Sequence, residues 1–234
     1  MFSRRNLRRW HVWLGWLIGV PMLFWTLSGV VMVVRPIEEV RGTALLRPEG
    51  AVKLATPPVA PQLEGLSVQS LALKSRSAGP RWVVTTSDGK SRMADPATGG
   101  LVPNYGAADA VREVEARYAG DAKVAATSRV DPDNPPRDLR REMDGWQVTM
   151  SDGTHFYVDS GSGEVVARRT RWWRFYDFMW GLHIMDLETR EDTNHAWIVS
   201  FGVLALISTL MALVLLPMTG KKKRNGSGKP AKQD

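Results

Sequence analysis

The sequence contains no cysteine in 234 residues. This absence excludes a disulfide scaffold, a thiolate metal site and a cysteine nucleophile, and it leaves histidine, carboxylates and methionine as the available metal ligands. The nucleophile elbow, the P-loop and the dinucleotide-binding fingerprint are also missing. None of these common motifs therefore assigns an activity.

Acidic residues are scarce at the two ends of the chain. The net charge is +7 and the isoelectric point is near 9.9. Ten of the 31 basic residues lie in residues 1–34 and 219–234, which hold a single acid, Asp234, whereas residues 35–218 carry 21 basic and 23 acidic residues. Because the excess positive charge belongs to the termini, the sequence argues against a nucleic-acid-binding domain.

Two long runs lack ionisable side chains. Each run has 23 residues without an ionisable side chain, and the two runs are Val12 to Val34 and Ala196 to Met218. A bilayer core requires about 20 residues of helix. A cleaved signal peptide is the alternative for the first run, but the run is longer than an ordinary signal core and no A-x-A-like cleavage site follows it. We therefore expect two transmembrane helices.

Basic residues flank the outer end of each run. By the positive-inside rule we expect both termini in the cytoplasm and the intervening loop of roughly 160 residues in the periplasm. Tryptophans that lie in or beside the runs are typical interfacial anchors in membrane lipid. They are Trp10, Trp13, Trp16, Trp25, Trp172, Trp173, Trp180 and Trp197.

The loop contains an internal repeat with an offset of 64 residues. Trp82-Val-Val-Thr-Thr-Ser-Asp-Gly recurs as Trp146-Gln-Val-Thr-Met-Ser-Asp-Gly, and the later Asp-x-x-[Thr/Ser]-Gly turn recurs as well. Alternating β-branched residues predict strands, and Asp-Gly predicts a tight hairpin. Four aspartates recur at turn positions, where Asp commonly stabilises the turn, so a structural role is expected rather than a catalytic one. They are Asp88, Asp95, Asp152 and Asp159.

A helix is expected before each hairpin set. The apolar pattern of Gly106 to Gly120 predicts a helix in the second copy, and a weaker pattern over Leu63 to Leu73 predicts one in the first. Proline-rich linkers are expected at 47–61 and 128–138. The expected fold is α+β, with two transmembrane helices flanking a periplasmic domain of two units, each a helix plus a three-stranded antiparallel sheet.

These motifs resemble a known family. A helix followed by W-x-V, D-G and V-D-x-x-[ST]-G-x-V resembles the PepSY domain, while Arg9-Trp10-His11 with Gly15 and Gly19, and Met179-Trp-Gly-Leu-His183 before the second run, resemble PepSY-associated transmembrane proteins. The resemblance covers almost the whole chain. The proposed division is 1–11 cytoplasmic tail, 12–34 first span, 35–61 linker, 62–103 first PepSY-like unit, 104–170 second unit, 171–195 amphipathic membrane-proximal segment, 196–218 second span and 219–234 cytoplasmic tail.

The resemblance implies a function in iron acquisition. Larger members are bacterial inner-membrane proteins linked to ferric-siderophore uptake, in which membrane histidines hold haem b and electrons reduce the ferric chelate. It thus implies a haem-dependent ferric-siderophore reductase component that works with a ferric-siderophore or TonB-linked uptake system. The chain has two spans rather than about four, which argues against a complete electron path within one copy.

Three of the four histidines lie at the expected membrane boundaries. We expect His183 and His195 to ligate one haem iron near the periplasmic face, and His11 to ligate a haem at the cytoplasmic side, since neutral imidazole is a suitable axial ligand. A non-haem metal held by His183 and His195 with Asp186, Glu188 and Glu191 is the alternative. His155 is expected to be an ordinary sheet residue.

Small residues follow His11 along one helical face. Gly15, Gly19 and Gly29 share this face, which suits helix packing or the approach of a flat macrocycle. Because only His11 lies at the cytoplasmic end, a haem with two histidine ligands there requires a homodimer. Two other functions stay open from the residues: a non-enzymatic membrane-anchored PepSY module that binds a protease or envelope partner, and a scaffold for a separate reductase or transporter.

Overall fold

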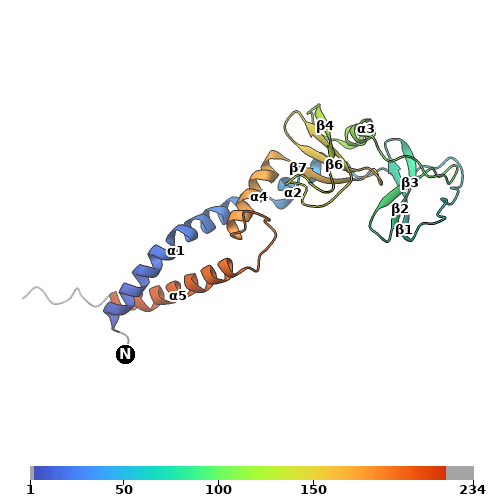
Figure 1. The fold of residues 1–234 in the computed structure, drawn as a ribbon. Coiled ribbons are helices and arrows are strands. Elements are labelled where there is room, and N and C mark those ends of the chain that lie inside the picture. The colour runs from blue at the N-terminus through green and yellow to red at the C-terminus, as the bar shows by residue number, and fades with distance from the viewer. Residues whose placement is uncertain (1–2, 220–234) are drawn as a thin grey trace, which may run out of the picture. The chain divides into compact units, whose positions relative to one another are not determined.

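The computed structural model describes residues 3–219, and the chain divides into two compact units (Figure 1). Unit 1 comprises residues 3–34 and 176–219, and unit 2 comprises residues 35–175. Most of the expected basic tail 219–234, and the first two residues of the tail 1–11, lie outside the described residues.

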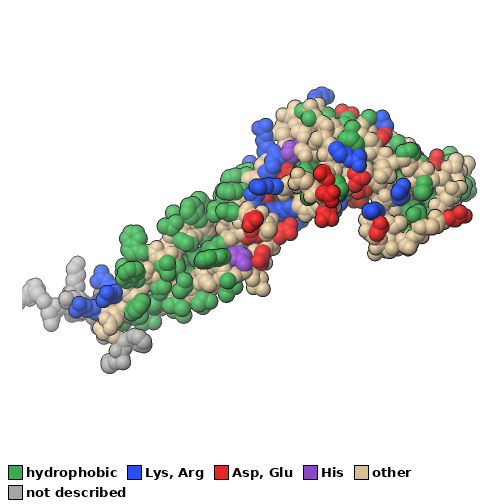
Figure 2. All heavy atoms as spheres, viewed as in Figure 1, with side chains coloured by type: hydrophobic (Ala, Val, Ile, Leu, Met, Phe, Trp, Pro, Cys, Tyr) green, Lys and Arg blue, Asp and Glu red, His purple; other side chains and the backbone are tan. Residues whose placement is uncertain are grey.

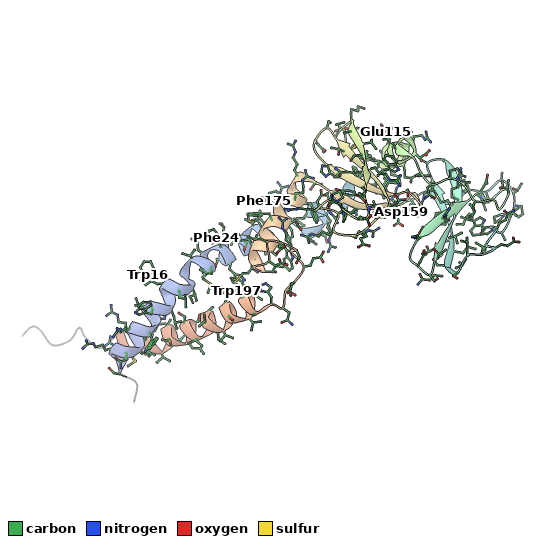
Figure 3. All side chains as sticks on the ribbon, in the orientation of Figure 1. Trp16, Phe24, Glu115, Asp159, Phe175 and Trp197 are labelled. Atoms are coloured by element: carbon green, nitrogen blue, oxygen red, sulfur yellow. The ribbon has the colours of Figure 1, made fainter. Side chains whose placement is uncertain are left out.

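Unit 1 is built on two long helices that lie side by side. Helix α1 spans Arg4–Val33 and α5 spans Ala196–Thr219, and both are long and apolar enough to cross a membrane. Their outward side chains are strongly exposed, as Trp16 at 83% and Trp197 at 79% illustrate (Figure 3). Exposed apolar surface on this scale suits a lipid environment, so the expected pair of membrane helices is confirmed.

Helix α4 spans Arg171–His183 and runs from unit 2 into unit 1. In unit 1 a loop connects its last residue to α5. Unit 2 begins with two short helices, α2 at Ile37–Val40 and the 3-10 helix η1 at Thr43–Leu45, and then contains two antiparallel sheets.

The first sheet has three strands in the order β1-β2-β3, which span Val68–Arg76, Gly79–Thr86 and Ser91–Ala94. The second has four in the order β4-β5-β6-β7, which span Val124–Val130, Gly145–Met150, His155–Asp159 and Val165–Arg169. Helix α3, at Ala107–Arg117, packs on the second sheet as expected. An α+β chain with two antiparallel sheets between two membrane helices is therefore confirmed.

The two sheets reproduce the sequence repeat in their strand register. Trp82 pairs with Ala94, and 64 residues later Trp146 pairs with Val158. Each sheet also has a register irregularity at the same relative place, opposite Thr86 in one and Met150 in the other. Identical register in both copies means that the repeat in the sequence is a repeat in the structure.

The copies differ at their edges, and two expectations are wrong. The helix expected over 63–73 does not form, since most of that stretch belongs to β1. The linker expected over 128–138 begins later, because β4 continues to Val130. The second copy has a fourth strand, β7, whose counterpart in the first copy is reduced to a single bridge between Ala94 and Leu101.

The core of unit 2 joins both copies. Val83 and Met93 of the first sheet are buried in one cluster with Val148 and Phe156 of the second and with Val114 of α3. The backbone of Gly161, after β6, lies so close to the carbonyl oxygen of Ser91 that a Cβ on this glycine would overlap it. The two sheets therefore share one hydrophobic core and do not form separate domains.

Candidate functional site

The three histidines expected to bind haem all belong to unit 1. His11 lies in α1, His183 is the last residue of α4, and His195 directly precedes α5. The fourth, His155, lies in β6 of unit 2, as expected. Their surroundings decide which ring nitrogens can bind a ligand.

His183 is clamped against α1. Its Nδ1 lies 3.1 Å from the carbonyl oxygen of Trp25 and 3.1 Å from the hydroxyl of Ser28, which is fully buried. A Cβ on Gly29 would lie 3.2 Å from Cε1 of the ring. When Nδ1–H donates to the Trp25 carbonyl, Nε2 carries the lone pair that iron requires. No hydrogen bond to this Nε2 is found within residues 3–219.

His11 links the two long helices. Its Nδ1 lies 3.3 Å from the hydroxyl of Ser208, a buried residue of α5. Along α1 the distance from His11 to Ser28 is about 26 Å, at 1.5 Å per residue. The two imidazoles are thus held near opposite ends of the helix pair. Each is held through Nδ1, and each contacts a serine of another helix.

His195 has the opposite arrangement. Its Nε2 lies 2.9 Å from the carbonyl oxygen of Ile184, the residue that follows His183. The chain therefore brings His195 back to the end of α4, which places both expected ligands in one region. However, the Nε2 atom of His195 is occupied by a backbone carbonyl, and a ligand would meet Nδ1 unless this bond breaks.

The loop between these histidines is organised by Asp186. Its carboxylate accepts hydrogen bonds from the hydroxyl of Thr189 and from four loop N–H groups, namely those of Glu188, Thr189, Glu191 and Asp192. The Thr189 hydroxyl, and then these N–H groups, hold the pKa of Asp186 well below its ordinary value. Among residues 3–219 no group of three or more histidine or acidic side chains is placed to hold a metal ion. The carboxylate thus stabilises the loop instead of completing the alternative non-haem site.

Arg190 fastens the same loop to α4. Its guanidinium donates to the buried carboxylate of Asp177 at 2.6 Å, and its carbonyl accepts from the indole of Trp180 at 3.1 Å. Gly181 provides the space, since a Cβ there would lie 2.8 Å from Cγ of Arg190. The sequence analysis did not predict these contacts of Arg190 with α4. Gly181, in the motif that ends at His183, was the residue that could have indicated them.

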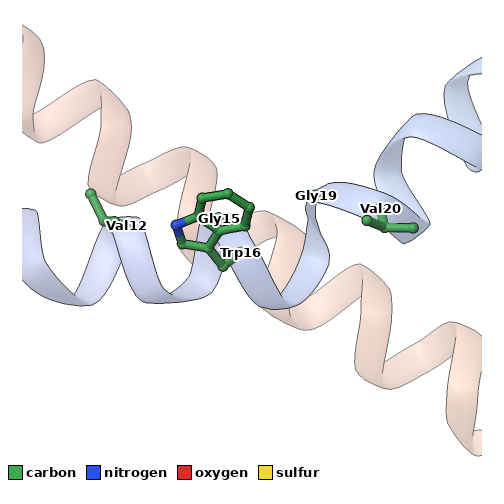
Figure 4. Close-up of a pocket in the computed structure, with 5 residues that line it drawn as sticks. All are labelled: Val12, Gly15, Trp16, Gly19 and Val20. Carbon is green, nitrogen blue, oxygen red and sulfur yellow. The ribbon is translucent and has the colours of Figure 1, made fainter.

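The glycine face of α1 divides into two parts. Gly29 meets His183, whereas a Cβ on Gly15 or Gly19 would meet nothing within 4 Å. Figure 4 shows these two glycines beside Val12, Trp16 and Val20 in a hollow on α1. The packing of α1 against α5 therefore does not use Gly15 or Gly19, and their face is open.

A polar network in unit 2 was not foreseen. Asp138 accepts hydrogen bonds from His155 Nδ1 at 2.9 Å and from the hydroxyl of Tyr157 at 2.5 Å. Burial would raise the pKa of Asp138, but these two hydrogen bonds outweigh it and hold the pKa below its ordinary value. Burial first, and then Asp138, raises the pKa of Tyr157 far above its usual value. The network secures the loop before β5 to the second sheet.

Comparison with known proteins identifies one family. A family model described as "PepSY-associated TM region" matches residues 8–233, which is nearly the whole chain. No curated protein and no solved structure gives a significant match.

Proposed function

The chain belongs to the family of the PepSY-associated TM region, and from this premise we propose that it binds haem b and passes electrons across the membrane to a periplasmic ferric chelate. A bound haem supplies reversible one-electron transfer at its iron. In this proposal the protein is an inner-membrane component of iron acquisition, with both termini in the cytoplasm and unit 2 in the periplasm. The electron donor is on the cytoplasmic or quinol side.

The observation that carries the proposal is the environment of His183. An axial histidine typically donates its second ring N–H to a carbonyl, which fixes the tautomer and increases the basicity of the ligating nitrogen. The contact between Nδ1 and the Trp25 carbonyl supplies this arrangement. His11 has a comparable one, with the Ser208 hydroxyl in place of the carbonyl. Both residues would hold haem iron through Nε2.

His195 completes the periplasmic pair under one condition. Its Nε2 has to leave the carbonyl of Ile184 before it can ligate iron through that atom. We propose that His183 and His195 together hold one haem, with His183 as the preset ligand and His195 as the ligand that reorients. The hydrogen bond to Ile184 keeps the His195 ring close to the end of α4.

A homodimer supplies the second ligand at the other end. His11 has no second histidine near the cytoplasmic end of its own chain, so we propose that His11 of a second copy provides it. The open face around Gly15 and Gly19 supports this assembly, because small residues allow helices in lipid to approach closely. Two helices from each copy then form a four-helix membrane bundle.

The test is an absorption spectrum of the full chain, purified in detergent after expression with a haem supply. We expect a Soret band and split visible bands of low-spin haem. His183→Ala and His195→Ala should each abolish the periplasmic low-spin signal, whereas His155→Ala is the matched control and should leave it intact. A double variant of His183 and His195 that retains the periplasmic signal would refute the assignment.

The acceptor is tested separately. When the haem protein is reduced and mixed anaerobically with a ferric chelate such as ferric citrate, we expect the spectrum of oxidised haem to return and ferrous iron to appear in equal amount. Reduced haem that persists would contradict a reductase role. A protein with no haem bands would instead favour the membrane-anchored module that binds a protease or envelope partner, or the scaffold.

A further inference from the structure

Arginine side chains gather on one part of unit 2. Lys and Arg side chains cluster in the region of α2, β7 and the start of α4, which the space-filling view shows as a concentration of blue (Figure 2). Within it a polar pocket of about 390 Å³ is lined by three arginines, Trp173 and β7. The lining residues are Arg41, Val165, Val166, Ala167, Arg168, Arg169 and Trp173. We call it the Arg–Trp pocket.

Backbone carbonyls accept hydrogen bonds from two guanidinium groups of this pocket. Arg168 Nε donates to the carbonyl of Arg41 at 3.1 Å, and Arg169 Nε donates to the carbonyl of Asp138 at 2.6 Å. Within residues 3–219 neither Arg41 nor Arg168 forms an ion pair. A carbonyl is a dipole and does not neutralise a cation, so this positive charge is not compensated.

The electrostatics of Arg168 lead to the same conclusion. Burial lowers the pKa of its guanidinium, and the like charge of Arg117 lowers it further. Glu38 and Glu39 of α2 are the acids nearest to Arg41 in the sequence, but both are exposed and neither forms an ion pair with it. The pocket thus concentrates positive charge that an anion from outside the chain would neutralise.

The tryptophans connect the pocket to the end of the first span. Arg169 lies over the ring of Trp173, 4.1 Å from its centroid, and Arg35 lies over the neighbouring Trp172 at 4.6 Å. Arg35 is only two residues beyond Val33, the last residue of α1. Arg35 and Trp172 therefore lie within a few residues of the points where the chain passes between unit 2 and unit 1, which holds the two apolar helices.

We propose that the Arg–Trp pocket binds the phosphate of an anionic lipid headgroup. The planar guanidinium fork matches two phosphate oxygens at once, and this geometry makes arginine a preferred phosphate ligand. Tryptophan is the residue most typical of the headgroup region. A lipid phosphate fits better than a free anion because Arg35 and Trp172 tie the pocket to the end of a membrane helix. The proposal does not depend on haem.

The test is native mass spectrometry of the full chain released from detergent, titrated with phosphatidylglycerol or phosphatidylcholine. Wild-type protein should prefer the anionic lipid. Each arginine near an anionic surface contributes about 1 kcal/mol, so the double variant Arg41→Gln, Arg168→Gln should bind phosphatidylglycerol about 30-fold more weakly. The double variant Arg92→Gln, Arg112→Gln removes the same charge from exposed positions of unit 2 and is the matched control, expected to bind like wild type.

A second variant guards against misfolding. Arg41 is exposed, so Arg41→Glu should leave the circular dichroism spectrum and melting temperature unchanged and still weaken phosphatidylglycerol binding by at least about 5-fold. Equal binding by wild type and Arg41→Glu would overturn the proposal. Inorganic phosphate that displaces the lipid from wild type at equal concentration would also overturn it, because the pocket would then be a site for soluble anions.

Discussion

The imidazole ring of His183 stacks on the indole ring of Trp25, with centroids 4.8 Å apart and planes inclined by 20°. The same tryptophan provides the carbonyl oxygen that lies 3.1 Å from Nδ1 of His183. One residue of α1 therefore limits both the tilt and the rotation of the ring. Such preorganisation is what a ligand-binding imidazole requires, because the cost of orienting it is met on folding.

Replacing Gly29 by leucine should displace the His183 ring while the histidine itself is left unchanged. Even a Cβ at this position lies 3.2 Å from the ring, so the larger side chain has to displace it. We expect loss of the low-spin haem spectrum on the periplasmic side. Gly202→Leu in α5 is the control, since a Cβ there meets nothing within 4 Å. Equal spectra for both variants would show that the position of the ring does not matter.

Gly15→Leu or Gly19→Leu should weaken the homodimer. The two positions are open within the chain, so a leucine is accommodated in the monomer and interferes only with a second copy. Light scattering in detergent should show a shift towards monomer, and the cytoplasmic-side haem should be lost with it while the periplasmic haem remains. A wild-type monomer that binds two haems would end the dimer proposal.

The two equivalent tryptophans should contribute unequally to stability. Trp146 packs on the main core and donates to the carbonyl of Tyr105 at 2.8 Å, whereas Trp82 lies outside that cluster and donates to the carbonyl of Val59. We expect Trp146→Ala to lower the free energy of unfolding by about 2 to 3 kcal/mol and Trp82→Ala by about 1 kcal/mol. Thermal melts of the full chain, followed by circular dichroism, measure the difference. Equal losses would mean that the two copies pack alike.

The stability of unit 2 should fall in acid through Asp138. Its pKa is lower in the folded than in the unfolded protein, so its stabilisation is complete above pH of about 4 and is lost as the pH falls through the folded-state value. Asp138→Asn should therefore be less stable at pH 7, and its melting temperature should decrease less than that of wild type between pH 5 and pH 2. Parallel profiles for the two proteins would exclude this contribution.

The proposed membrane topology predicts opposite compartments for two reporter fusions. A reporter after Asp234 should be cytoplasmic, and one inserted in the proline-rich stretch 47–61 should be periplasmic, because ten basic residues lie at the two ends of the chain. Alkaline phosphatase and a fluorescent protein distinguish the two sides. A C-terminus that reports from the periplasm would contradict the orientation proposed for both haems.

The sequence predicted the features that depend on local pattern. Apolar runs predicted α1 and α5, and the Asp-Gly turns predicted the β2–β3 and β5–β6 hairpins. Strand β1 was missed because Leu63, Leu66 and Leu73 would lie on one face of a helix, at steps of three and seven residues, whereas the strand form of β1 depends on pairing with β2. Gly79 adopts φ +100° where the β1–β2 turn ends. A glycine at this position was the local sequence signal that favoured a hairpin.

The candidate site was predictable in composition but not in geometry. The scarcity of histidine pointed to His11, His183 and His195. However, the contacts that orient His183 join it to residues more than 150 positions away, and no local pattern in a single sequence encodes such a distance. The link from Asp138 to His155 and Tyr157 was missed because it joins a loop residue to a strand 17 and 19 residues later, and no periodic pattern marks such a contact.

The close approach of Gly161 to Ser91 makes the two copies non-equivalent. The position equivalent to Gly161 in the first copy, 64 residues earlier, is Ala97, whose methyl group the first copy accommodates. An exchange of the copies would bring that methyl group against a carbonyl oxygen of the neighbouring sheet. The halves of this duplication are therefore no longer interchangeable, because only the second half has a glycine at the position that lies against the neighbouring sheet.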